Sequence, residues 1–144
     1  MSRELARAFY LRLTAVTADS TNPVRTAVSD RIFALEAPIS SELPLAVWTM
    51  DSASSSSFFG GSTQVQASID LSLFGKAEAG VDALAGIEAS AFALLHDQNI
   101  TSGLSAFDRA YIRCETRGVP ALEGEFLRVD STFIIEGSDS SATS

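Results

Sequence analysis

The sequence is poor in the residues that build metal and redox sites. Its 144 residues include one cysteine, Cys114, and one histidine, His96. A single cysteine excludes an internal disulfide and a cysteine-based metal cluster. A single histidine excludes a histidine-rich metal site within one chain. We therefore expect no cofactor and no bound metal.

Long apolar runs are also missing. The longest uncharged stretch, residues 52–69, is rich in serine, glycine and glutamine, whereas a membrane-spanning helix needs about 20 mainly apolar residues. The first seven residues carry charges where a secretory signal would have an apolar run. We expect a protein that is made in the cytoplasm and does not associate with membranes.

Positive charge is scarce. Ten lysines and arginines stand against eighteen aspartates and glutamates, which gives a net charge of −8. Binding of nucleic acid through the general surface requires a basic patch, so this balance argues against it. A chain of this length corresponds to one ordinary domain with a real core. We expect a single domain over residues 1–136, followed by a disordered polar tail over residues 137–144.

Two sets of apolar residues at helical spacing predict two long amphipathic helices. A proline at residue 23, after an asparagine cap, predicts a short helix near residues 23–28. In the two long helices, over about residues 2–18 and 76–95, the predicted buried stripes are Leu5, Phe9, Leu13 and Val16, and Val81, Leu84, Ile87, Ala91 and Leu94, with Glu88 outside the second stripe.

Five segments show the pattern of β-strands. The clearest is 64–73, in which apolar residues alternate strictly with polar ones, and it is expected to form a hairpin with 45–50. The others are 31–36, with Phe33 and Leu35 on one face, 107–117 and 127–136. Four consecutive serines and two glycines predict a mobile connection over 51–63, and 118–124 is expected to be a turn.

One sheet with two helices on one face would bury every one of these apolar stripes. The sequence therefore predicts a two-layer α+β domain with a mostly antiparallel sheet of about five strands. No internal repeat and no linker to a second domain interrupts this order.

The polar faces of the last two predicted strands carry the candidate contact residues. Arg109, Tyr111 and Arg113 point outward from one strand, and Arg128 points outward from its neighbour. Cross-strand charge pairs on a solvated sheet would account for these residues, and so would a subunit interface, where arginine and tyrosine are enriched. Phe58 and Phe59 either fold back onto the body or anchor a partner.

No set of side chains forms an expected active site. His96 follows the long helix, whose C-terminal dipole favours a solvated cation. Cys114 lies on the apolar side of its strand, where cysteine acts as a small hydrophobe. Glu123 and Glu125 read as a solvated acidic turn. We expect a protein that is not an enzyme.

The order of elements carries a family resemblance. After the opening helix and a strand, Leu-Pro-Leu-Ala-Val-Trp leads into a hairpin whose second strand reads Val-Gln-Ala-Ser-Ile-Asp-Leu-Ser-Leu-Phe. Gly-Lys-Ala-Glu-Ala then opens the long helix, and two strands follow. Over roughly residues 5–136 the chain resembles the tail terminator, or tail completion, proteins that join head and tail in long-tailed bacteriophages. Related proteins occur in prophages and gene transfer agents.

The resemblance implies a structural protein in the neck of a virion. The family forms a hexameric ring that ends polymerisation of the tail tube protein and meets the head connector or stopper protein. DNA passes through the lumen without specific binding, and there are no catalytic residues. Two alternatives stay open: another neck or connector ring protein, and a compact dimeric α+β domain that binds or converts a small ligand. In the latter, Arg109, Tyr111 and Arg113 would be the candidate cluster.

Overall fold

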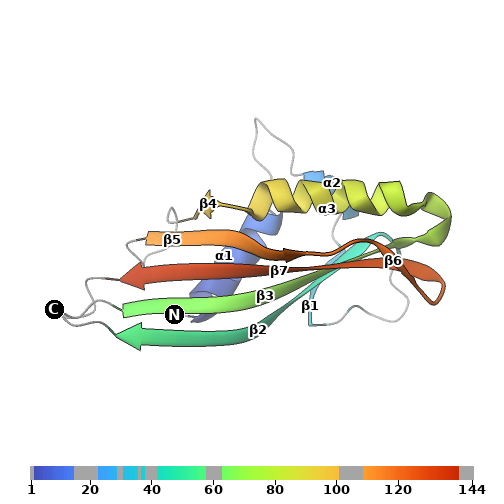
Figure 1. The fold of residues 1–144 in the computed structure, drawn as a ribbon. Helices are drawn as coiled ribbons and strands as arrows, with labels where there is room; N and C mark the ends of the chain where they lie inside the picture. The colour runs from blue at the N-terminus through green and yellow to red at the C-terminus, as the bar shows by residue number, and fades with distance from the viewer. Residues whose placement is uncertain are drawn as a thin grey trace.

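One bent sheet organises the chain, and the helices α1 and α3 pack on one of its faces (Figure 1). This computed structural model describes residues 2–14, 23–28, 31–35, 37, 42–57, 63–100 and 109–139. The helical elements are α1 (Ser2–Thr14), α2 (Pro23–Val28), the 3-10 turn η1 (Ala77–Ala79) and α3 (Val81–Leu95). The strands are β1 (Ile32–Ala34), β2 (Leu45–Ser57), β3 (Thr63–Lys76), β4 (Gln98–Asn99), β5 (Arg109–Arg117), β6 (Ala121–Glu123) and β7 (Phe126–Asp139).

Seven strands form the sheet within these described residues. Their order is β1-β2-β3-β7-β5-β4, and β6 pairs with β7 beyond the end of β5. Every pair is antiparallel except β1 with β2. The predicted α+β class and the mostly antiparallel sheet are confirmed. The strand number exceeds the prediction because β4 and β6 have only two and three residues, too few for an alternating pattern to show.

The core lies between the sheet and the helices. The ring centre of Phe9 on α1 lies 5.7 Å from that of Trp48 on β2 and 6.0 Å from that of Phe133 on β7, with the rings tilted in both pairs. The short helix α2 is confirmed and contributes Val24 and Val28. The predicted alternation along β3 is also confirmed, since the buried hydrophobic side chains of that strand are Val65, Ala67, Ile69, Leu71 and Leu73. The sheet-facing side of α1 buries Leu5, Phe9 and Leu13. The helix-facing side of β7 buries Leu127, Val129, Phe133 and Ile135.

The prediction of a mobile connection over 51–63 is wrong for residues 51–57 and for Thr63, which begins β3. These residues continue β2, and Ser52–Ser57 pair one by one with residues 63–68 of β3. Strand preference depends strongly on context. Here β3 is held on its other side by β7 along its whole length, so it offers the serine run a ready partner. Residues 58–62 lie outside the described part of the chain.

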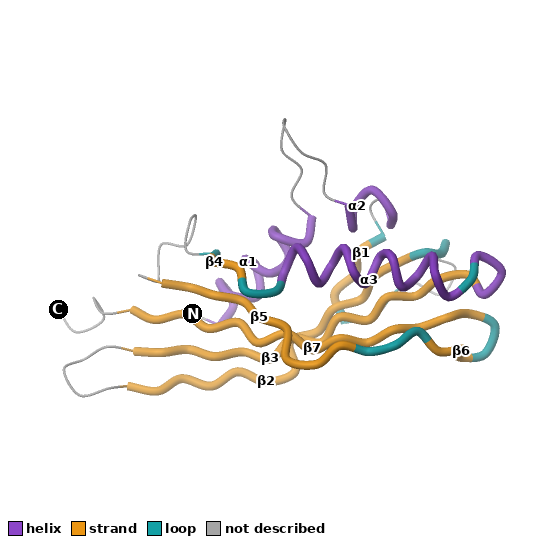
Figure 2. Tube along the Cα trace, turned by 45° about the horizontal axis from the view of Figure 1, so that its top comes forward, coloured by secondary structure: helices purple, strands orange, loops and turns teal. Residues whose placement is uncertain are grey.

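Two β-bulges lie at the same level of the sheet. The extra residues are Asp51 in β2 and Glu115 in β5, and the bulges flank Ile69 of β3 and Phe133 of β7, which pair with each other. Bulges bend a strand and shift the alternation of its faces by one residue. The strands bend near this level in Figures 1 and 2. The shift also turns Arg117, at the end of β5, toward the helices.

Several predicted boundaries and faces need correction. Helix α3 begins at Val81, because Gly80 adopts a φ of 90° that interrupts the helical path after η1. Val81 is exposed. In β1 the buried residue is Ile32, whereas Leu35, with a φ of 73°, is 75% exposed. A turn was expected over 118–124, but β6 forms there and pairs with β7.

The two ends of the chain also differ from the prediction. Strand β7 continues through residues 137–139, which were expected in the polar tail, because β3 and β5 supply partners for their backbone groups. Helix α1 is described as far as Thr14, and residues 15–18 of the predicted helix and residues 140–144 lie outside the described part. Among the described residues, none of the helices has the length and hydropathy needed to cross a bilayer.

Candidate functional site on the open face of the sheet

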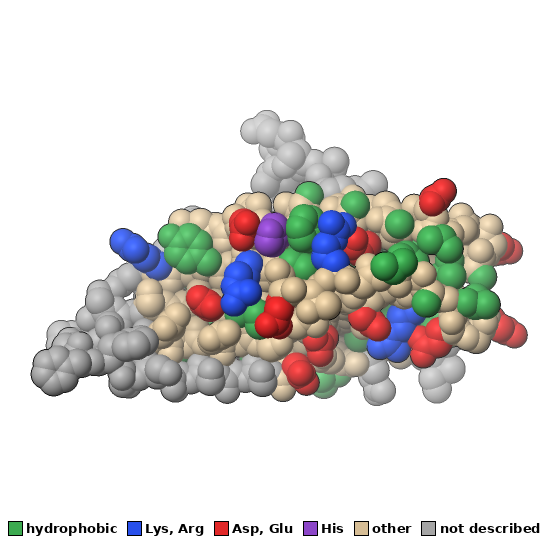
Figure 3. All heavy atoms as spheres, viewed as in Figure 1, with side chains coloured by type: hydrophobic (Ala, Val, Ile, Leu, Met, Phe, Trp, Pro, Cys, Tyr) green, Lys and Arg blue, Asp and Glu red, His purple; other side chains and the backbone are tan. Residues whose placement is uncertain are grey.

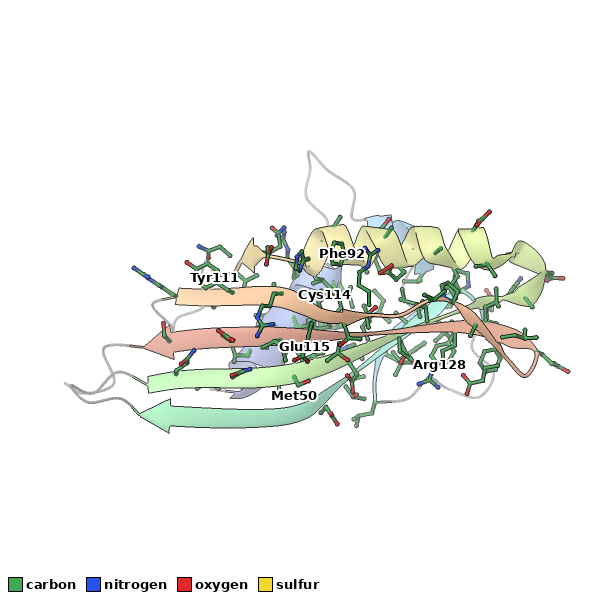
Figure 4. The ribbon with its side chains drawn as sticks, viewed as in Figure 1. Met50, Phe92, Tyr111, Cys114, Glu115 and Arg128 are labelled. Carbon is green, nitrogen blue, oxygen red and sulfur yellow. The ribbon has the colours of Figure 1, made fainter. Side chains whose placement is uncertain are left out.

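No described element covers the face of the sheet opposite the helices, here called the open face. Three of the predicted contact residues gather at one end of it. Arg109, Tyr111 and Arg113 alternate along β5 and are all exposed, as predicted. Tyr111 is 49% exposed. Figure 4 shows Tyr111 and Arg128 toward opposite ends of the sheet.

Arg113 forms a cross-strand ion pair, which is one of the two interpretations that the sequence left open. Its Nη2 atom lies 3.6 Å from Oε1 of Glu136 on β7, and both side chains are partly exposed. Such a pair contributes at most about 1 kcal/mol. Ile134, which stands opposite Arg113 on β7, is buried although it lies on the open face. These side chains line an open hollow of about 260 Å³ with an apolar floor and a charged rim, formed by Asp97, Tyr111, Ile112, Arg113, Ile134 and Glu136.

Arg128 belongs to a separate cluster near the other end of the same face. Its Nε donates a hydrogen bond to Asp130 at 2.9 Å, and its Nη1 donates one to Glu123 of β6 at 3.3 Å. These hydrogen bonds, of which the one to Asp130 has the largest effect, raise the pKa of Arg128 above its ordinary value. The guanidinium also lies 5.2 Å from the ring centre of Phe74. Six residues of β7, about 20 Å of strand, separate Arg128 from the position opposite Arg113.

Side chains of both signs are interspersed over the open face (Figure 3). Hydrogen bonds join β3 to β7 there: Ser72 donates to Asp130 at 2.6 Å, and Thr132 donates to Asp70 at 2.9 Å. The predicted cross-strand pairing is therefore present at Arg113 and Arg128. A subunit interface at these residues stays a prediction, as do both hypotheses for Phe58 and Phe59, which lie outside the described residues.

The sequence did not predict a cluster of charged and aromatic side chains that lies between α3 and β5. Glu88 was expected outside the buried stripe but is only 7% exposed. Arg117 of β5 donates to both of its carboxylate oxygens, at 2.6 to 3.2 Å. These hydrogen bonds raise the pKa of Arg117. The guanidinium also lies 4.0 Å from the ring centre of Phe92. The available signal was the spacing of Glu88, Phe92 and His96, which places them on one side of the helix.

His96 fastens the end of α3 to the edge of β5. Its ring stacks on Phe92 with centroids 4.5 Å apart. Its Nδ1 accepts a hydrogen bond from the backbone N–H of Cys114 at 3.0 Å, and its Nε2 lies 3.1 Å from Oδ2 of Asp97. In neutral imidazole this geometry requires the proton on Nε2. The expectation of a merely solvated histidine is wrong, because β4 does not reach Cys114 and the outward N–H of Cys114 bonds to the ring instead.

The single cysteine lies in the same cluster. Cys114 is partly buried against the core, as its position on the apolar side of the strand predicted. Burial raises the pKa of its thiol above the ordinary value, although nearby Arg117 acts in the opposite direction. The thiol therefore stays protonated at neutral pH.

The end of the sheet near β6 carries exposed apolar side chains. Val119 and Leu122 are 81% and 67% exposed, and Val81 at the start of α3 is also exposed. Figure 3 shows apolar side chains gathered at this end, with acidic side chains around them. A second open hollow of about 400 Å³ lies here, lined by Gly118, Val119, Ala121, Leu122, Glu123, Arg128 and Asp130.

Comparison with known proteins finds a likeness in fold. No protein-family model matches the sequence, and no curated protein matches it. Among solved structures, a chain in the virion of a native gene transfer agent particle superposes with a TM-score of 0.73 at 16% sequence identity. The match covers 96% of this chain and 97% of that chain. The two chains therefore share one fold over nearly their whole lengths.

Proposed function

We propose that this chain is a structural protein of a phage-like particle, where it forms a hexameric ring at the head-proximal end of the tail tube. The observation that carries the proposal is the fold likeness, nearly end to end, to a chain of a gene transfer agent virion. The resemblance in element order to tail terminator proteins supports the same position in the particle. In that position the ring ends tube polymerisation and joins the tail to the head connector.

The surfaces of the domain suit a ring. A closed ring uses head-to-tail contacts, so each subunit needs two different contact surfaces. The open face offers a hollow with Tyr111 on its wall at one end. Exposed Val119 and Leu122 lie near β6, at the other end of the sheet. The two surfaces differ in composition and lie toward opposite ends of a long sheet (Figure 4), which supports heterologous contacts over a two-fold dimer.

Deletion of the gene in cells that produce the particle tests this function. We expect tail tubes of uncontrolled length that do not join heads, and a copy of the gene supplied in trans restores normal particles. Cryo-electron microscopy of the restored particles should place the chain in the neck as a ring of six. Tails of normal length that merely fail to join heads would favour a connector. Normal particles from the deletion strain would contradict the proposal.

A further inference from the structure

The sheet has three edges within the described residues, and the edge at β5 is closed. Strand β4 pairs with Tyr111 and Ile112. The carbonyl of Ala110 accepts a hydrogen bond from the N–H of Ile100 at 2.9 Å. The next outward N–H, that of Cys114, is taken by the ring of His96. These outward groups of β5 are therefore occupied, and β4, which becomes the outermost strand, has only two residues, too few to pair with an added strand.

The second edge, at β6, is too short to accept a strand. It has three residues, and they follow Pro120, which has no N–H to donate. A two-residue turn at Gly124 and Glu125 joins β6 to β7. Natural proteins commonly protect sheet edges with short strands and proline, and β6 has both.

The third edge, along β2, is open. Strand β1 pairs with Ala46, Val47 and Trp48 only, and the N–H of Leu35 bonds the carbonyl of Trp48 at its end. From Met50 to Ser57 no described element borders the outer side of β2 (Figures 1 and 2). These eight residues span about 27 Å of unpaired strand.

The register shows which backbone groups on this edge point outward. Ala46 and Trp48 direct theirs to β1, and both stand opposite odd-numbered residues of β3. Beyond the bulge, Ala53 and Ser55 again stand opposite odd-numbered residues of β3. Their N–H and C=O groups therefore point away from the sheet, whereas Ser52, Ser54 and Ser56 bond to β3.

Beyond the bulge at Asp51, the open edge lacks the usual devices against strand addition. Residues 52–57 contain no lysine and no proline, the residues that most often protect an edge. An exposed strand edge of this kind binds extended peptides through backbone hydrogen bonds. The contrast with the closed edges at β5 and β6 indicates that the opening at β2 is a binding feature.

We propose that the edge of β2 from Ala53 to Ser57 accepts an extended strand of a different virion protein. The inference rests on the proposed function. Pairing of β2 with β2 of a second copy would be a two-fold contact, which gives pairs and not a ring of six. The described part of a second copy offers no other open edge longer than three residues. The strand therefore comes from a partner of the ring, and backbone pairing makes this contact tolerant of the partner's sequence.

Amide hydrogen exchange tests this edge, with an internal control. In the free full-length chain, the amides of Ala53 and Ser55 should exchange at nearly the rate of an unfolded peptide, whereas those of Ser54 and Ser56 should be protected. In purified particles, we expect the exchange of Ala53 and Ser55 to slow at least tenfold. Protection of these two amides in the free chain would overturn the inference, and so would their fast exchange in the particle.

Substitution at one outward position tests the same edge by assembly. Ser55→Pro removes an N–H that the free chain does not use, so its circular dichroism spectrum should match that of wild type. We expect at least tenfold less Ser55→Pro chain in purified particles, and wild-type amounts of the control Ser55→Ala, which keeps the N–H. Equal incorporation of both variants would refute strand addition.

A photo-crosslinking residue at position 55 identifies the occupant in intact particles. Crosslinked peptides from another virion protein support the inference, whereas peptides from a second copy of this chain overturn it. The result is separable from the proposed function, which fails if the chain lies outside the neck. The inference alone fails if the chain lies in the neck and its edge amides stay exchangeable.

Discussion

At the scale of single residues, the two partners of the ion pair between Glu88 and Arg117 differ in how far they are buried. The side chain of Glu88 is 9% exposed and that of Arg117 is 44% exposed. Loss of the arginine leaves a buried carboxylate without its partner, which is costly. Loss of the carboxylate leaves an arginine that water can solvate and that keeps its contact with the ring of Phe92.

The two substitutions should therefore differ in their effect on stability. We expect Arg117→Ala to lower the free energy of unfolding by about 3 kcal/mol, and Glu88→Gln by about 1 kcal/mol. Urea denaturation measures both. Arg113→Ala, which removes an exposed pair, is the control and should cost under about 1 kcal/mol. Equal losses for Arg117→Ala and Arg113→Ala would show that the buried pair does not hold α3 on β5.

At the scale of elements, two glycines test how closely neighbouring segments approach. Gly118 leads from β5 to β6, and a Cβ atom there would overlap the carbonyl oxygen of Asp130 on β7. Gly86 lies inside α3, where an added Cβ would meet no atom within 4 Å. Glycine-to-alanine substitution should therefore lower the free energy of unfolding at residue 118 and raise it at residue 86.

Gly118→Ala should destabilise the protein by about 1–3 kcal/mol, because the backbone of β7 cannot move without disturbing the sheet. Gly86→Ala should stabilise it by up to about 1 kcal/mol, because alanine favours the helix interior. Thermal unfolding followed by circular dichroism measures both. A stabilising effect at Gly118 would mean that β5 and β6 cross β7 less closely than in this structure.

At the scale of the whole molecule, the excess of acidic residues bears on the proposed passage of DNA. Each chain carries a net charge of −8, so six copies in a ring carry −48. Acidic residues lining the lumen would repel DNA, whereas acidic residues spread over the outside would leave the lumen neutral. Neither arrangement uses the counterion release by which proteins hold DNA.

The assembled protein should therefore not bind DNA, even where electrostatic attraction is strongest. Fluorescence polarisation of a short labelled duplex at about 20 mM salt, where screening is weak, should show no change on addition of the chain. A basic DNA-binding protein run in parallel confirms that the assay responds. Saturable binding that weakens as salt rises would reveal a basic lumen and contradict the proposed passage.

Much of the candidate surface could be predicted from local alternation. The outward positions of Arg109, Tyr111 and Arg113 follow from the two-residue period of β5, and the structure agrees. The separation of Arg128 from them could not be predicted, because it depends on the offset at which β5 pairs with β7. That offset is a property of two strands and leaves no mark in either one alone.

The sequence by itself determined the α+β class, the two amphipathic helices and the alternation of β3, because burial of one face imposes a period of 3.6 or 2 on each element. Only the tertiary structure decided that the serine run continues β2, that Asp51 and Glu115 are bulged, and that the β2 edge stays open. These features depend on which backbone groups neighbouring strands pair with or leave unpaired. Backbone groups are the same in every residue except proline, so the side-chain pattern does not record them.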